Sequence, residues 1–377
     1  MDYDKLALDL HKQYGGKIAT HLRDTSQLDT TKLSAYYTPG VAAVSKAIAD
    51  DPSKLSEYTW TNNLVAVISD GSAVLGLGNI GPRGSMPVME GKSLLFKHFA
   101  GIDSVPITLD VHTPDEIVSV VKAIAPSFGA INLEDIAAPQ CFEIEERLKK
   151  ELPIPVFHDD QHGTATVVLA GLINAAKVTN RDLTTSKIVV VGAGAAGTAI
   201  IKLLKLYGVG KILAVDSKGI VSHARSDLNN AKKLLLEHSH GDEDGSLADA
   251  LTDADIFIGV SQPGLLTKEL VRTMAKDPIV FALANPMPEI LPEDAHSAGV
   301  AVIATGRSDF PNQVNNAIAF PGIFRGALDH QVRDITDQHK IAAAEAIASM
   351  VAEPTADCII PSVFTEGLVE TIADVIR

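Results

Sequence analysis

Short apolar runs alternate with segments of helical periodicity along the first half of the chain, which is typical of an α/β fold. These runs are rich in apolar and β-branched residues, as expected for parallel strands that are buried on both faces. They predict strands at Leu64–Ser69, Val105–Leu109, Ala130–Leu133 and Pro155–Phe157. Helices are predicted between them, at Pro114–Ala125 and Pro139–Glu151. The first helix follows Thr113, a suitable N-cap, and has proline at its first position.

A second series of the same kind occupies the rest of the chain. It follows a long helix that begins near Gly163 and ends in the polar stretch TNRDLTTS, where we expect a domain boundary. Its predicted strands are Lys187–Val191, Lys211–Val215, Asp255–Gly259, Ile279–Leu283 and Val300–Ala304. The 377 residues exceed the roughly 100–200 of a typical domain, so the length also favours two domains.

A glycine-rich loop joins the first strand of the second series to the helix behind it. In KIVVVGAGAAG, Gly192, Gly194 and Gly197 directly follow an apolar strand and precede an amphipathic helix. In this context GxGxxG indicates dinucleotide binding, because the glycines make the turn, admit the pyrophosphate and let the helix approach the strand. Amides at the helix N-terminus, at Ala195 and Ala196, would meet the phosphate charge. A glycine turn that serves only packing is the alternative.

An acidic residue ends the strand after the glycine helix. Asp216 lies nineteen residues after Gly197, where a carboxylate can bind both ribose hydroxyls. Its charge would repel the 2′-phosphate of NADP, so we expect NAD, although Lys218 could offset the repulsion. We therefore predict an N-terminal α/β domain at residues 1–164. Residues 165–377 are predicted to form an NAD-binding, Rossmann-type domain with a doubly wound parallel sheet.

Two pairs of carboxylates follow neighbouring strands of the first series. Glu134 and Asp135 come directly after AINL, and Asp159 and Asp160 follow the strand PVF. A helix separates the two strands, so both pairs should lie at the same edge of a parallel sheet, where open α/β sheets bind ligands. Carboxylates crowded there would repel one another unless a cation neutralised them, and oxygen ligands favour Mg²⁺ or Mn²⁺. Helix N-caps or solvated loop acids are the alternative.

Two histidines in HDDQH, His158 and His162, have a spacing that could suggest zinc. Because the segment lies at a strand–helix junction, a regular two-histidine helical face is doubtful. We expect both histidines to form hydrogen bonds in a loop.

Composition and charge narrow the function classes. The formal charge of −15 makes nucleic-acid binding improbable, because phosphate recognition needs a basic surface. Two distant cysteines, Cys141 and Cys358, favour a reducing cytoplasm over a disulfide scaffold. No stretch reaches the ~18 apolar residues of a membrane span, and the first residues lack an apolar signal-peptide core. We therefore expect a cytoplasmic protein with no membrane or nucleic-acid partner.

Together, four segments of this chain resemble the malic enzyme family, in its short prokaryotic form. They are YTPGVA, GLGNIGPRGSMPVMEGK, INLEDI with FHDDQHGTA, and FALANP with NQVNNAIAFPG. The segments occur in the family's order between residues 37 and 322, with the glycine loop in its expected place. The resemblance implies oxidative decarboxylation of L-malate to pyruvate and carbon dioxide with NAD and a divalent metal. It also implies a homodimer.

The resemblance assigns roles to single residues. Glu134, Asp135 and Asp160 would bind the metal, and Asp159 would act beside them. Lys92 would be the base on the malate hydroxyl, and Tyr37 the acid that protonates the enolpyruvate carbon. Asn285 and Asn316 would hold the substrate and the nicotinamide side of the pocket, with Tyr36 and Asn315 as rivals of Tyr37 and Asn316. On the sequence alone, Lys92 could equally be a surface lysine and Tyr37 a core aromatic.

One departure affects substrate recognition. Longer relatives carry an arginine just before LGLG that helps to hold a malate carboxylate, where this chain has Ala73 and Val74. Arg83 in the next loop is a candidate replacement. Other functions remain open: a metal-dependent oxaloacetate decarboxylase, a malate-to-lactate enzyme that keeps NAD bound, or a non-catalytic dinucleotide sensor.

Overall fold

The first predicted sheet is present in the computed structural model, which describes residues 3–74 and 76–377. Its strands are all parallel in the order β2-β1-β3-β4, with bounds β1 Leu64–Ser69, β2 Asp103–Thr108, β3 Ala130–Leu133 and β4 Val156–His158. The helices of this domain are α5 Gly81–Ala100, α6 Pro114–Ile124, η3 Ala125–Ser127 and α7 Gln140–Glu151. Strand β2 begins two residues earlier than predicted, because this half-buried edge strand starts with the polar Asp103 and Ser104.

The second sheet has the order β10-β9-β8-β5-β6-β7. Its strands are β5 Lys187–Val191, β6 Lys211–Asp216, β7 Gly219–Ile220, β8 Ile256–Gly259, β9 Ile279–Ala282 and β10 Val302–Thr305. All pairings are parallel except that of β7, a two-residue strand that is too short to show a sequence pattern. The helices are α9 Ala195–Tyr207, α10 Asn230–Leu236, α11 Leu247–Leu251, α12 Lys268–Val271 and α13 Pro292–Ala298. The α/β class with a Rossmann-type second domain is confirmed.

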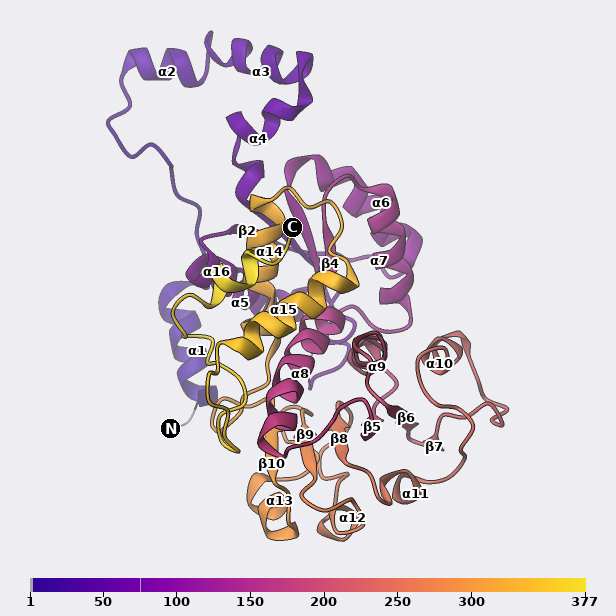
Figure 1. Ribbon diagram of the computed structural model, residues 1–377. Coiled ribbons are helices and arrows are strands. Elements are labelled where there is room, and N and C mark those ends of the chain that lie inside the picture. Colours follow the sequence, from indigo (N-terminus) through magenta and orange to yellow (C-terminus); the bar gives the residue numbers. More distant parts are fainter. Residues whose placement is uncertain (1–2, 75) are drawn as a thin grey trace.

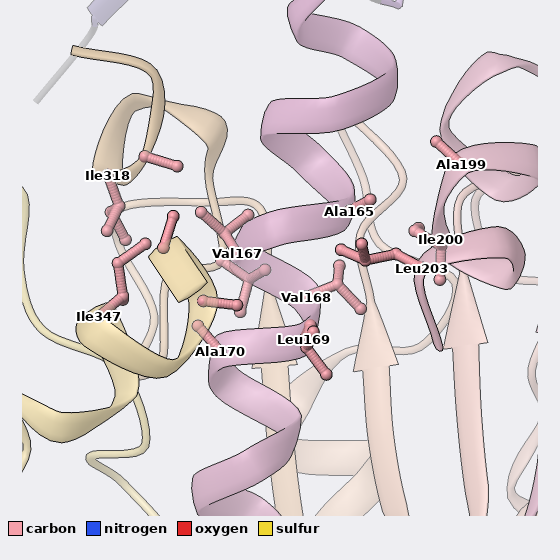
Figure 2. Packing of buried hydrophobic residues seen from close by; sticks show 14 of the residues in the cluster. Ala165, Val167, Val168, Leu169, Ala170, Ala199, Ile200, Leu203, Ile318 and Ile347 are labelled. Carbon is pink, nitrogen blue, oxygen red and sulfur yellow. The ribbon is translucent and has the colours of Figure 1, made fainter. Parts of the chain in front are cut away.

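Helix α8 (Asp159–Val178) connects the two sheets and begins four residues before the predicted start. The polar DDQH segment resembles a loop, but acidic residues in a first helical turn are stabilised by the helix dipole. The expectation that His158 and His162 lie in a loop is therefore wrong: His158 ends β4 and His162 lies in α8. Figure 2 shows Val168 of α8 on the side that faces Leu203 of α9, and Val167 and Ala170 on the opposite side, toward Ile318 and Ile347.

The last part of the chain returns to the first domain. It forms η4 Asn316–Ile318, α14 Phe320–Asp329, α15 Asp337–Ser349 and α16 Leu368–Ala373. Phe320 and Phe324 of α14 meet Phe96 of α5 edge-on, with ring centroids 4.8 and 5.1 Å apart. Such aromatic contacts stabilise by about 0.5–1.5 kcal/mol each beyond the area that they bury. The predicted division at residues 164 and 165 falls inside α8, and it remains a prediction about folding units.

The N-terminal region is built differently from the rest. It comprises α1 Tyr3–Tyr14, α2 Thr30–Tyr36, α3 Val41–Asp50, η1 Pro52–Lys54, α4 Leu55–Tyr58 and η2 Trp60–Asn63. No residue from 3 to 60 is buried in the single chain. We call residues 24–59 the arm; Figure 1 shows its helices α2 and α3 projecting away from the two domains. No helix in the described ranges is long and apolar enough to cross a membrane.

Candidate active site

A cleft of about 930 Å³ lies where the carboxyl ends of the two sheets face each other, as expected for ligand sites in α/β folds. The first domain contributes Lys92 from α5, Glu134 and Asp135 after β3, and Asp160 from the start of α8. The second domain contributes the loops after its strands, with Gly194, Ala195, Ala196, Val260, Ser261, Asn285, Asn315 and Asn316. The cleft therefore unites most of the predicted site residues.

Lys92 is buried at the floor of this cleft. Its Nζ lies 2.6 Å from Asp159 Oδ2 and 2.8 Å from Glu134 Oε1, and 4.3 Å from the centre of the Phe320 ring. Only 7% of the lysine is exposed. The alternative of a surface lysine is therefore wrong, and the ammonium group lies between two carboxylates.

The charges around Lys92 are strongly coupled. Burial disfavours its ammonium form, but the neighbouring Asp159 and Glu134 carboxylates outweigh this effect and raise the pKa of Lys92. Burial in turn raises the pKa of Asp159 and of Asp160 to about 6, and also raises the pKa of Glu134. The raised pKa favours the ammonium form of Lys92, and a reduction of the surrounding negative charge would favour the neutral amine.

The carboxylates have the donor chemistry of a hard-cation site. Strands β3 and β4 are parallel neighbours, as predicted, and this places Glu134 and Asp160 at one edge of the sheet. Asp160 Oδ2 accepts a hydrogen bond from the backbone N–H of Asp135 at 2.7 Å. Asp159 Oδ1 is buried without a hydrogen-bond partner, so Lys92 alone leaves negative charge uncompensated. These residues fit a divalent cation, although the described residues include no group of three or more metal-ligating side chains already arranged around one point.

A buried carboxylate that we did not predict supports the start of α8. Glu145 of α7 accepts hydrogen bonds from the backbone N–H of His158 at 3.0 Å, from Gln161 at 3.3 Å, and from His162 Nε2 at 2.8 Å. It thus fixes the turn that carries Asp159 and Asp160. Burial lowers the pKa of His162 to about 4, so this histidine is neutral. The contact depends on α7 packing against β4, for which the sequence gives no local signal.

Ion pairs extend this support to the second domain. The buried Lys340 of α15 lies 3.2 Å from His162 Nδ1 and 2.9 Å from Asp337 Oδ1. Asp337 Oδ2 pairs at 2.9 Å with Lys202 of α9, the helix behind the glycine loop. Residues of α15 therefore link the start of α8, which carries Asp159 and Asp160, to helix α9 behind the glycine loop.

The glycine loop has the geometry of a pyrophosphate cradle. Gly192 has φ +125°, and a Cβ there would lie 2.7 Å from the carbonyl oxygen of Val260. A Cβ on Gly197 would lie 1.8 Å from the carbonyl oxygen of Gly192, so only glycine lets α9 approach β5 this closely. Gly194, in contrast, faces open space in the cleft, and no side chain caps the helix behind it. The N–H groups of α9 are thus available to a phosphate.

Asp216 ends β6 beside this loop, as predicted, but its carboxylate is not free. It is bound by the guanidinium of Arg225 and by Lys232, two cations that we did not predict as part of the site. Both lie beyond β7 in segments without a motif. Lys218, which we expected to offset the charge, donates its backbone N–H to Asp216 and pairs through Nζ with Asp227.

Some of the remaining predicted site residues line the cleft, and others do not. Asn285, Asn315 and Asn316 all line the cleft, and the side chain of Asn315 is used to cap η4 at Ala317. Arg83, the proposed replacement for the missing arginine, is exposed and does not line the cleft. Lys17 does line it, and its Nζ donates to the carbonyl of Pro87 at 2.7 Å. Lys17 and Lys92 are the two cations among the described lining residues.

Tyr37 lies outside the cleft of its own chain. It caps the end of α2 on the arm, with 70% of the residue exposed, so the alternative of a core aromatic is wrong. Its rival Tyr36 is also exposed, and the Tyr36 hydroxyl donates to Asp24 on the arm at 2.8 Å. Within one chain, therefore, neither tyrosine is brought to Lys92.

Comparison with known proteins adds to these observations. Residues 161–370 match the family model described as the malic enzyme NAD binding domain, and residues 17–116 and 112–149 match the malic enzyme N-terminal domain. The chain is 55% identical to the bifunctional malic/malolactic enzyme of Bacillus subtilis, over 97% of this chain and 90% of that one. It is also 55% identical to the NAD-dependent malic enzyme of Geobacillus stearothermophilus, over 95% and 75% of the two chains. The crystal structure of the NAD-dependent malic enzyme of Thermotoga maritima matches with a TM-score of 0.95 and 49% identity, over 98% of each chain.

Proposed function

The chain belongs to the malic enzyme family, and we propose that it oxidises and decarboxylates L-malate to pyruvate and carbon dioxide while reducing NAD. The observation that carries the proposal is the position of Lys92. The lysine is buried between Asp159 and Glu134 at the floor of a cleft that the glycine loop also lines. The same cleft is thus lined by a group that can transfer a proton, by carboxylates that can bind a metal, and by the glycine loop that can bind a dinucleotide.

Proton transfer is the step of the reaction that side chains of the protein itself perform. Hydride can leave C2 of malate only as its hydroxyl loses a proton, and Lys92 is placed to take that proton as a neutral amine. Asp159, 2.6 Å from Lys92 Nζ, orients the amine and stabilises it once it is protonated. Gly194 and the start of α9 would hold the pyrophosphate of NAD, which would supply the hydride acceptor.

We assign the metal ligands to Glu134, Asp135 and Asp160. A Mg²⁺ or Mn²⁺ ion at these residues would supply Lewis-acid chemistry toward the substrate oxygen and toward the negative charge left by loss of carbon dioxide. Such an ion would also compensate the carboxylates around Lys92, and so weaken the interaction that keeps the lysine protonated.

We further propose that the protein works as a homodimer in which Tyr37 serves the partner's cleft. Tyr37 is the acid expected to protonate the enolpyruvate carbon, yet it lies on the exposed arm. Most of the exposed large hydrophobic side chains of the described residues belong to the N-terminal region, among them Leu33, Val41, Val44 and Trp60. Apolar surface of this extent is normally covered by a partner, and a second copy of the chain closes such a contact by twofold symmetry.

Substrate carboxylates need positive charge in the cleft. Lys17 is the lining cation that remains after Lys92 is assigned to proton transfer, so we propose that it contacts a carboxylate of malate. Asn285 and Asn316 would supply hydrogen bonds to the substrate and to the nicotinamide side. In this assignment Lys17, which is distant in sequence, takes the role that an arginine before LGLG has in longer relatives.

Malate-to-lactate conversion is a second candidate, because the Bacillus subtilis relative is named a bifunctional malic/malolactic enzyme. The two reactions differ in the fate of the cofactor: lactate formation leaves no net NADH. We keep the cytoplasm as the proposed location, in keeping with the free thiols of Cys141 and Cys358.

The proposal is tested by product analysis with ¹³C-labelled L-malate, Mn²⁺ and NAD, followed by NMR. Pyruvate as the main product, with equimolar NADH, is the expected result. Lactate without NADH would favour the second candidate. Turnover of added oxaloacetate without turnover of malate would mean that only decarboxylation is catalysed.

A further inference from the structure

A buried glutamate to which the proposed function gives no role lies behind the second domain's side of the cleft. Glu289 is in the segment between β9 and α13, and its side chain is completely buried, with 0% of the residue exposed. Its partners in the described part of the chain are backbone N–H groups and not cations. A buried carboxylate is costly unless its hydrogen-bonding capacity is satisfied, so the groups that Glu289 binds explain its presence there.

Each carboxylate oxygen of Glu289 binds a different loop. Oε1 accepts a hydrogen bond from the backbone N–H of Ser261, in the loop after β8, at 2.9 Å. Oε2 accepts one from the backbone N–H of Ala284, in the loop after β9, at 3.0 Å. The backbone carbonyl of Glu289 accepts a third from Leu266, which holds the glutamate's own segment against the first loop. One carboxylate thus ties together the carboxyl ends of two neighbouring parallel strands through charge-assisted hydrogen bonds.

The end of β8 is shaped to admit this carboxylate. A Cβ on Gly259, the last residue of β8, would lie 2.5 Å from both the carboxyl carbon and Oε1 of Glu289. Any other residue at this position would therefore have to displace the carboxylate. Burial raises the pKa of Glu289, and the N–H groups of Ser261 and Ala284 oppose this effect by favouring the charged form. Because both oxygens accept hydrogen bonds, the arrangement fits a carboxylate and does not fit an amide.

The two loops that Glu289 holds line the cleft on the side where the nicotinamide is expected. Four of their residues line the same cleft as Lys92: Val260, Ser261, Ala284 and Asn285. In the second sheet, β5 lies between β6 and β8, and β9 follows β8. A dinucleotide with its pyrophosphate at the glycine loop after β5 and its adenosine half over β6 therefore has its nicotinamide half over β8 and β9. There it would face Lys92 of the first domain.

We propose that Glu289 is a positioning residue for the nicotinamide end of the cofactor. It does not touch the cofactor itself. It fixes the spacing of the loops after β8 and β9, so that Ser261 and Asn285 present preorganised contacts to the nicotinamide. The inference rests on the proposed function, because it takes dinucleotide binding at the glycine loop as its premise.

The test is isothermal titration of the metal-free protein with NADH and with ADP-ribose, which has the same adenosine and pyrophosphate but no nicotinamide. In Glu289→Gln the side chain keeps its size, but its amide NH₂ faces a backbone N–H, so one of the two loops is released. We expect this variant to weaken NADH by about tenfold or more relative to the wild type, because a buried N–H loses its acceptor. The Kd for ADP-ribose should stay within about twofold, since the glycine loop is untouched.

Glu293→Gln is the matched control, because Glu293 is exposed on α13 and the substitution removes the same charge. It should change neither Kd. Glu289→Asp keeps the charge but is one methylene shorter, so it cannot hold both loops as they are. It should also weaken NADH selectively, and it serves if Glu289→Gln does not fold.

The outcomes separate a positioning role from general support of the domain. Equal weakening of NADH and ADP-ribose by the Glu289 variants would overturn the inference, because the glutamate would then stabilise the whole domain. Unchanged NADH binding in folded Glu289 variants would overturn it as well. A wild type that binds neither ligand would instead contradict dinucleotide binding, and with it the proposed function on which the inference rests.

Discussion

A mixed-dimer experiment follows from the position of Tyr37. The perturbation combines two single variants, Tyr37→Ala and Lys92→Met, in one preparation of dimers. Tyr37 is 70% exposed, so its truncation should change the free energy of unfolding by no more than about 0.5 kcal/mol. Lys92→Met keeps the shape of the side chain and removes its charge. Each variant alone should lack malate oxidation.

The expected activity can be worked out from the arrangement. Random association of equal amounts gives about one half mixed dimers. If the arm serves the partner, one cleft of each mixed dimer has both Tyr37 and Lys92 intact, and the other cleft has lost both. The mixture should then recover about a quarter of the wild-type activity per subunit, and purified mixed dimers about a half.

Co-expression with two different affinity tags isolates the mixed dimers, and size-exclusion chromatography verifies their mass. Malate oxidation is then followed at saturating substrate. Inactive mixed dimers would show that Tyr37 serves its own subunit, since no cleft would then combine both residues. Near-normal turnover in the Tyr37→Ala homodimer would refute its role as an acid.

Further outcomes are expected at the cleft. Asp160→Ala and Lys92→Ala should each abolish malate oxidation, with a loss of at least about 10²-fold, while NADH binding survives in titrations; appreciable turnover in either would contradict its role. Lys17→Gln should raise KM for malate by about tenfold at nearly constant kcat, because it removes one carboxylate contact, and an unaltered KM would exclude it. Glu145→Gln should weaken Mn²⁺ binding by about 10–100-fold, measured by electron paramagnetic resonance, since Glu145 fixes the turn that carries the ligands. Glu146→Gln, an exposed neighbour on the same helix, should leave Mn²⁺ affinity unchanged, and an equal effect of both variants would show that only net charge matters.

The strands of both sheets were the most predictable part of the fold. Buried parallel strands are apolar on both faces, so β1, β3 and β5 could be predicted to the residue. The start of α8 could not, because its first turn is polar: it carries Asp159 and Asp160, and Asp160 lines the cleft. The polar residues there suggest a loop, whereas the structure has a helix; such conflicts between local sequence and structure are common at functional sites.

Some features of the candidate site could likewise be predicted from the sequence, and others could not. Acidic residues after β3 and β4 could be placed at one sheet edge, because parallel strands direct their carboxyl ends alike. The role of Lys92 came from family resemblance, and its burial between carboxylates became visible only in three dimensions. Arg225 was missed because it lies in a loop without a motif. In the proposed homodimer the cleft that Tyr37 serves belongs to the partner chain, which a pattern within one chain does not describe.

The most direct test of malate oxidation is absorbance at 340 nm with purified protein, L-malate, Mn²⁺ and NAD. The account predicts a steady rise that stops when EDTA removes the metal, with one pyruvate formed for each NADH. No absorbance change with either NAD or NADP, in a folded dimer that holds metal, would contradict the proposed oxidation of malate.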